Sequence, residues 1–131
     1  MVGRNGSSCL TLENVKSSVT INSSYNGDAQ HGGLVGYAIK ADLIGCAFVG
    51  RILGGNSKGC GGLLGYKTDE SDASKKVTIT NCFFAPANVT VSTTSAYTLA
   101  NNSSTGVVEI SNCYYTQALG TVQGKQAHSI T

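Results

Sequence analysis

The sequence contains the stretches HGGLVGYA (His31–Ala38) and CGGLLGYK (Cys60–Lys67), which repeat one glycine-rich phrase at two places in the chain. A glycine-rich loop can hold a phosphate when the N-terminus of a helix follows it, because the free backbone N–H groups there bind anions. Here the first copy continues into YAIKADLIG, which is short and strand-like, and the chain contains neither GK[ST] nor GxGxxG. The phrase therefore favours a repeated structural element over a phosphate site.

A second phrase combines a short strand pattern with a small residue and two aromatic residues. It occurs as VTITNCFF (Val77–Phe84) and VEISNCYY (Val108–Tyr115), with looser copies at DLIGCAF (Asp42–Phe48) and VTINSSYN (Val19–Asn26). Apolar and polar residues alternate along the copies, as in a strand with one buried face. The aligned copies share one small-residue position, filled in chain order by Ser24, Cys46, Cys82 and Cys113.

Repeats of roughly 20–35 residues built from short strands are typical of β-solenoids, in which each turn of the chain stacks on the previous one. The composition agrees, because 17 of the 131 residues are glycine and only 12% are charged. We therefore predict an all-β fold, namely a right-handed parallel β-helix-like solenoid of about four to five rungs. It should form a single domain over residues 1–131, with repeats at roughly 19–41, 42–76, 77–107 and 108–125.

The repeated positions are assigned to the scaffold. Glycines of the phrase would allow positive φ or a close approach between rungs, while its leucines would point into the core. The cysteines would form one ladder of small buried thiols that need no partner, with a disulfide between neighbouring rungs as the alternative. The predicted structural positions are Gly33, Leu34, Gly36, Gly62, Leu63, Gly65, Cys46, Cys82 and Cys113. Because His31 aligns with Cys60, we interpret it as a packing residue and not as a catalytic base.

The order of the two phrases, G-G-L-x-G and then I-x-N-C-[YF]-[YF], resembles the GLUG-motif repeats of bacterial surface proteins. These include non-catalytic regions of immunoglobulin-A-cleaving metallopeptidases and adhesin-like proteins of gut Bacteroidetes. Gly33–Gly36 and Gly62–Gly65 match the motif, Ile79–Phe84 and Ile110–Tyr115 match its companion strand, and the resemblance covers roughly residues 19–125. It implies a β-helical repeat on an exported protein, with adhesion or spacing as its role. The third interval has SAYTLANN where a glycine phrase is due, so the array degenerates there.

Two groups of residues are candidate ligand contacts. The second aromatic of each pair is the candidate for the surface, so Phe84 and Tyr115 are the candidate glycan contacts, although core or ladder packing of these aromatics is favoured. The other group lies in TDESDAS, inside the charged insertion Lys67–Lys76, which we expect to project as a loop. It consists of Asp69, Glu70 and Asp72. Calcium would need about six to eight oxygen ligands, and the EF-hand spacing is missing, so a solvated loop is favoured.

Composition and motifs argue against several classes of function. Without a CxxC pair or HExxH, no metal, cofactor or peptidase activity is predicted. The net charge of +2, without a basic cluster interleaved with aromatics, indicates no nucleic-acid partner. No apolar run approaches the roughly 20 residues of a transmembrane helix. The start of the chain lacks the apolar core of a signal peptide. An extracellular or cell-surface location therefore follows from the resemblance, and we expect the chain to be a fragment of a longer exported protein.

These observations predict a non-enzymatic extracellular or cell-surface module that binds a host glycan or protein, or acts as a spacer. One alternative is a carbohydrate-active β-helix enzyme, which would need clustered carboxylates. On the mapped strand faces Glu109 is the only acid, and Asp42 looks isolated. The other alternative is a purely structural stalk. Neither terminus looks like a strong cap, so end-to-end self-association through unpaired strand edges is also expected.

Overall fold

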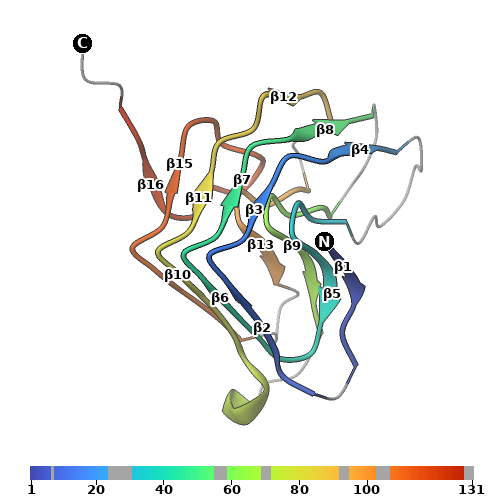
Figure 1. Cartoon of the computed structure of the whole chain (residues 1–131), viewed down its shortest axis with the longest axis vertical. Helices are drawn as coiled ribbons and strands as arrows, with labels where there is room; N and C mark the ends of the chain where they lie inside the picture. Colours follow the sequence, from blue (N-terminus) through green and yellow to red (C-terminus); the bar gives the residue numbers. More distant parts are fainter. Residues whose placement is uncertain are drawn as a thin grey trace.

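The structure is a computed structural model that describes residues 1–6, 8–23, 31–54, 59–68, 72–91, 95–102 and 107–128. Within these ranges the chain forms sixteen short strands and one 3-10 helix, so the predicted all-β class is confirmed. The strands make four sheets, here called A to D, and every strand pairing in them is parallel (Figure 1).

Each sheet takes its strands from separate parts of the chain. Sheet A contains β1 (Val2–Arg4), β5 (Val35–Ala38), β9 (Leu64–Lys67) and β13 (Ala100–Asn102). Sheet B contains β2 (Leu10–Glu13), β6 (Ala41–Ile44), β10 (Val77–Thr80) and β14 (Val108–Ser111). Sheet C contains β3 (Lys16–Ser17), β7 (Ala47–Phe48), β11 (Phe83–Phe84), β15 (Tyr114–Tyr115) and β16 (Lys125–Gln126). Sheet D contains β4 (Thr20–Asn22), β8 (Arg51–Leu53) and β12 (Asn88–Val89), and the 3-10 helix η1 (Ala73–Lys75) precedes β10.

The chain visits the sheets in a fixed order. It passes through A, B, C and D, returns to A, and places each new strand beside its counterpart from the preceding visit (Figure 1). We call one such passage a circuit. Parallel neighbours need a long connection between them, and here the remainder of each circuit supplies that connection. In the described part of the chain, three circuits cross all four sheets, while the fourth contributes β13, β14 and β15.

The alternating pattern of sheet B places one set of apolar side chains toward the core. Two inward ladders run through the sheet: Leu10, Ala41, Val77 and Val108, and Leu12, Leu43, Ile79 and Ile110. The members on β6 and β10 are fully buried, whereas those on β2 and β14 are only half-buried. The two outer strands are less covered because no further described strand stacks on them.

The corner between sheets B and C is a left-handed residue in every circuit. Asn14, Asn81 and Asn112 have φ values of 56°, 55° and 51°, and Gly45 has 63°. Asparagine and glycine tolerate this region better than other residues. Asn112 Nδ2 also donates a hydrogen bond to Asn81 Oδ1, at 2.6 Å. The asparagine of the I-x-N-C phrase therefore fixes a turn.

The residue after this corner is the small ladder position, and the register corrects its first member. β3 pairs with β7, and the Ala47 N–H donates to the Val15 carbonyl, so Val15 stands where the later circuits have cysteine. The alignment of Ser24 with Cys46 is therefore wrong. The stretch Val19–Asn22 instead contains β4, which pairs with β8. The stretch with β4 and the strands of sheet B show the same apolar–polar alternation, so alternation alone does not tell which sheet a strand belongs to. Ser24 itself lies outside the described residues.

Close packing explains the glycines of the repeated phrase. A Cβ atom on Gly62 would lie 2.1 Å from the carbonyl oxygen of Thr98 and 2.7 Å from the ring of Phe84. A Cβ on Gly33 would lie 2.4 Å from the ring of Phe48. Neither glycine has positive φ. Of the two predicted reasons, close approach is confirmed and a left-handed backbone is not the cause.

The third copy of the phrase keeps its path without its glycines. Leu34 and Leu63 are fully buried, as predicted, and Leu99 is fully buried at the equivalent position. Thr98 takes the place of Gly62, and its hydroxyl lies 3.2 Å from the carbonyl of Leu119 and 3.0 Å from that of Thr121. A side chain fits there because the next level is a short terminal segment, whose Leu119 and Thr121 carbonyls accept hydrogen bonds from the Thr98 hydroxyl.

Candidate functional site

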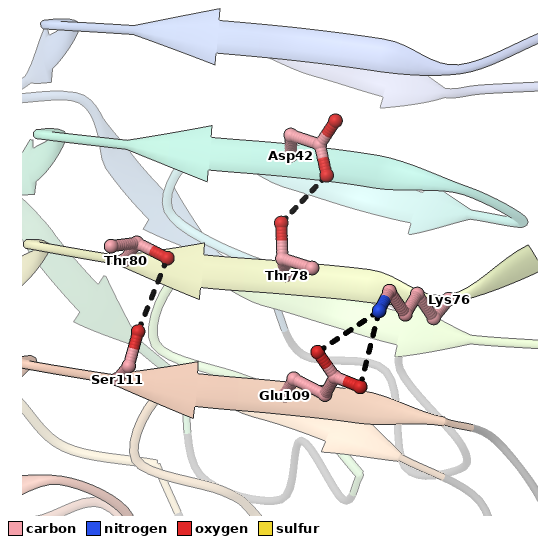
Figure 2. A network of polar contacts seen from close by, with 6 residues as sticks. All are labelled: Asp42, Lys76, Thr78, Thr80, Glu109 and Ser111. Carbon is pink, nitrogen blue, oxygen red and sulfur yellow. Dashed lines mark hydrogen bonds and ion pairs between the residues drawn. The ribbon is translucent and has the colours of Figure 1, made fainter. Parts of the chain in front are cut away.

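The outer face of sheet B carries an ordered row of polar side chains. The register aligns Asp42 on β6, Thr78 on β10 and Glu109 on β14 (Figure 2). Burial alternates along these strands, and the three residues belong to the less buried set: Asp42 and Thr78 are half-buried and Glu109 is exposed. The Thr78 hydroxyl donates to Asp42 Oδ1 at 2.6 Å. Asp42 therefore lies in the same outward row as Glu109, and the interpretation that Glu109 is the only acid on these strand faces was wrong.

Further contacts extend this polar face along the strands. Lys76 Nζ contacts both carboxylate oxygens of Glu109, at 3.2 and 3.1 Å, and Figure 2 shows the pair beside the Thr78 position. The hydroxyls of Thr80 and Ser111 lie 3.3 Å apart on the next outward positions. The Lys76 and Glu109 side chains are 38% and 59% exposed. Solvent screens such a pair, so its contribution to stability is small.

The two carboxylates of this face stand on different strands, and each has its own partner. Asp42 and Glu109 lie two strands apart, which corresponds to about 10 Å at the usual strand spacing. Each is already bound, one by the Thr78 hydroxyl and the other by Lys76. A glycosidase needs both acids directed at one bond. The arrangement is suited to presenting hydrogen-bonding groups to a ligand.

The structure corrects the predicted aromatic contacts. Phe84 is completely buried and stacks on Phe48 with ring centroids 5.8 Å apart, and Tyr115 is 8% exposed. The outward member of the last pair is Tyr114, which is 39% exposed. Because Cys82 points inward after the corner, strand alternation turns the first aromatic outward and the second one inward. Phe84 and Tyr115 are thus core residues and not surface contacts.

Sequence reasoning missed a second aromatic stack, which lies on sheet A. The rings of Tyr37 and Tyr66 stack with centroids 5.7 Å apart, and the Arg4 guanidinium lies 4.8 Å from the Tyr37 centroid. The tyrosines are half-buried and Arg4 is exposed. The two tyrosines occupy the same position in the two copies of the glycine phrase, so their recurrence in GLVGY and GLLGY was the available signal.

The acidic candidates have only one member that the structure describes. Asp72 caps η1, where its Oδ1 accepts hydrogen bonds from the Ser74 hydroxyl at 2.8 Å and from the Ser74 N–H at 2.9 Å. These bonds lower the pKa of Asp72 from its ordinary value. Asp69 and Glu70 lie outside the described residues. The insertion does not begin at Lys67 as expected, because Lys67 is fully buried at the end of β9.

The cysteine ladder is buried, as predicted, and none of its three thiols is in a disulfide. Cys46, Cys82 and Cys113 are at most 2% exposed. The thiols of Cys82 and Cys113 are hydrogen-bonded to each other, and the Cys82 N–H also lies 3.4 Å from Cys113 Sγ. The bond between them lowers the pKa of Cys113 to about 7 and raises that of Cys82. Across the described residues, no group of three or more histidine, cysteine or acidic side chains is placed to hold a metal ion.

Two hollows lie at opposite ends of the stacked circuits. One of about 220 Å³ is lined by Met1, Val2, Gly3, Ile21, His31, Gly32 and Gly36. Burial lowers the pKa of His31, and neither ring nitrogen has a hydrogen-bond partner among the described residues. The other hollow, of about 490 Å³, is lined by Ile110, Asn112, Cys113, Tyr114, Gln123, Gly124 and Lys125. The predicted packing role of His31 fits its place beside apolar residues.

Comparisons with known proteins add no relative. The chain matches no protein-family model, and no match was found for it among curated proteins or among solved structures. In the parts of the chain that are described, no helix is long and apolar enough to cross a membrane. The geometry of the polar face and of the hollows is therefore what supports a function.

Proposed function

We propose that this chain is a β-helical solenoid module of an exported, cell-surface protein, and that it binds a glycan or protein partner through the outer face of sheet B without catalysing a reaction. Four parallel sheets visited in a constant order are what a solenoid requires. A right-handed path is the usual one for parallel strands joined by crossovers. The two sequence phrases that resemble GLUG repeats support the surface location.

The observation that carries the binding proposal is the row of Asp42, Thr78 and Glu109. Its groups are held by one another and by Lys76 at the fixed spacing of neighbouring strands. Donors and acceptors that are already positioned lose little conformational freedom when a ligand binds. A partner with many hydroxyl groups, such as a glycan chain lying across the strands, can exchange hydrogen bonds with such a face.

The residues of this face also distinguish the proposal from its two alternatives, the enzyme and the structural stalk. A carbohydrate-active enzyme would use Asp42 and Glu109 for proton transfer, whereas their existing bonds and their separation fit recognition better. A structural stalk would bind nothing through this face. Ligand binding without turnover is the result that favours the proposal.

The test is an array of glycans and host surface proteins probed with the wild-type chain and with two variants. Thr78→Val combined with Thr80→Val removes two hydroxyls from the face and keeps the branched side-chain shape. Thr20→Val makes the same change on exposed β4 of sheet D and serves as the control. We expect the double variant to lose at least about tenfold in affinity, since each lost hydrogen bond contributes about 1 kcal/mol.

Three outcomes would contradict the proposal. If no ligand bound, the alternative of a purely structural stalk would be favoured. Cleavage of an acidic polysaccharide that is lost in Glu109→Gln would establish the enzyme. Equal loss in the Thr20→Val control would show that the ligand does not use sheet B.

A further inference from the structure

The segment from Thr121 to Lys125 passes directly from sheet A to sheet C and omits sheet B. Gly61 and Thr121 occupy equivalent bridge positions, and Phe83 and Lys125 occupy equivalent positions in sheet C. The segment from Gly61 to Phe83 contains β10, but only three residues separate Thr121 from Lys125. The chain therefore starts a new level on sheets A and C and adds no strand to sheet B at that level.

A side chain closes sheet A at this level. Gln123 Oε1 accepts hydrogen bonds from the N–H groups of Leu99 and Ala100, at 2.9 and 2.8 Å, and its Nε2 donates to the Ala100 carbonyl at 3.0 Å. One circuit earlier, the equivalent N–H groups of Leu63 and Leu64 both donate to the Leu99 carbonyl. The side-chain oxygen of Gln123 thus accepts the two hydrogen bonds that a backbone carbonyl accepts one circuit earlier.

A short strand closes sheet C at the same level. β16 pairs with β15, and the Lys125 and Ala127 N–H groups donate to the carbonyls of Cys113 and Tyr115 at 3.0 and 2.8 Å. Gly124 makes this close approach possible, because a Cβ there would lie 2.8 Å from the Cys113 oxygen and its φ is +82°.

Sheet B stays open between these two closures. β14 is its outermost strand in the described structure. The Val77 and Asn81 N–H groups donate to the carbonyls of Val107 and Ser111, so alternation along β14 directs the backbone groups of Val108 and Ile110 away from β10. The side chains of Val108 and Ile110 are half-buried, while their counterparts on β10 are fully buried.

The 490 Å³ hollow lies along this edge. Ile110 and the following corner form one side of it, and Gln123, Gly124 and Lys125 form the other. Lys125 is the one charged side chain among its lining residues, and no carboxylate faces it from that lining. Among the described residues, the hollow thus offers backbone groups of β14 that no strand pairs, the half-buried side chain of Ile110 and the positive charge of Lys125.

We infer that the C-terminal end of the molecule binds an extended peptide segment, which adds to sheet B as a fifth strand parallel to β14. The segment has apolar residues opposite Val108 and Ile110, as the ladders of sheet B require, and an acidic residue near Lys125. Main-chain hydrogen bonds provide the affinity in this mode of recognition, and side-chain pockets provide the specificity. The inference does not depend on what binds to the outer face of sheet B.

A whole second copy does not fit this edge. Stacking β2 of another copy on β14 would bring its β3 to the level that β16 occupies, and its β1 to the level of the Gln123 amide. A single strand avoids both collisions. The open edge of β14 and the hollow beside it therefore suit an isolated extended segment of a partner protein.

The experiment titrates the ¹⁵N-labelled full chain with acetyl-Ser-Val-Thr-Ile-Glu and follows its amide resonances by NMR. In the proposed register the valine and isoleucine of the peptide face Val108 and Ile110, and the peptide threonine N–H donates to the Val108 carbonyl. N-methylation of that threonine removes a donor, whereas N-methylation of the peptide isoleucine alters an N–H that points away from β14. This pair of peptides is matched in composition.

We expect saturable shifts at Val108, Ile110 and Lys125 with the parent and the N-methyl-isoleucine peptide, and at least a tenfold weaker effect with the N-methyl-threonine peptide. Replacing the peptide glutamate by lysine should weaken binding by about threefold, since exposed ion pairs are worth up to about 1 kcal/mol. The absence of saturable shifts, shifts centred on β2, equal binding of the two N-methyl peptides, or a concentration-dependent dimer of the chain alone would each overturn the inference.

Discussion

Replacing Gly62 by alanine tests whether close packing determines the repeated phrase. The added methyl group would lie 2.1 Å from the Thr98 carbonyl oxygen and 2.7 Å from the Phe84 ring. Neither neighbour yields easily, because the Thr98 backbone is held by its N–H, which donates to the Thr121 carbonyl, and Phe84 is fully buried. Overpacking of this kind costs about 1–3 kcal/mol and sometimes more. With two clashes, one against backbone, we expect a loss of about 3 kcal/mol or more.

Urea denaturation measures this loss, and Gly3→Ala is the matched control. Gly3 lies on β1, and a Cβ there would meet no atom within 4 Å. Its replacement should leave the free energy of unfolding unchanged or raise it by up to about 1 kcal/mol, because alanine restricts the unfolded chain. A Gly62→Ala variant within about 0.5 kcal/mol of wild type would refute the packing argument, since surface substitutions give changes of that size.

Three other substitutions test the corners, the core and the pH dependence of stability. Asn81→Ala should lower the free energy of unfolding by about 1–2 kcal/mol, because alanine disfavours a φ of 55°, while Asn81→Gly should cost less; equal losses in urea melts would contradict this. Phe84→Ala should cost about 3–5 kcal/mol and Tyr114→Ala under about 1 kcal/mol, and the reverse order would show that the inward aromatic is misassigned. Burial holds the pKa of His31 below 6.5, so the unfolded chain gains a proton first and stability should fall as the pH drops below 6.5; in His31→Phe this part of the pH dependence of the urea midpoint should vanish, and its persistence would exclude His31 as the cause.

The sequence was sufficient to predict those features that recur in more than one circuit. Leu34 and Leu63 recur beside glycines, and both are buried where backbones approach closely. Cys82 and Cys113 recur after an asparagine, and both follow a left-handed corner into the core. Such positions are predictable because stacking puts equivalent residues into equivalent surroundings, so one physical demand appears several times in the chain.

The features that the sequence did not predict depend on phase or on a single contact. Alternation counted from the inward Cys82 turns Phe84 inward, and the placement of Phe84 nearer the surface did not follow that count. The first circuit has Val15 in the cysteine position, and a similar strand further along attracted the alignment. Thr98 replaces a glycine because the level that follows it is different. The positions of Val15 and Thr98 depend on contacts with the neighbouring circuit, which the local pattern does not contain.

The cap at the C-terminal end shows the same limit and changes the expectation of end-to-end association. A periodic pattern cannot reveal Gln123, because one amide does there what a strand would do elsewhere. With β16 it closes sheets A and C, so a second copy cannot continue those sheets unless both are displaced. Unpaired edges are normally covered or blocked because they invite further strands. A chain that blocks two edges and leaves β14 open between them restricts what can bind there to one strand, which distinguishes selective recognition from polymerisation.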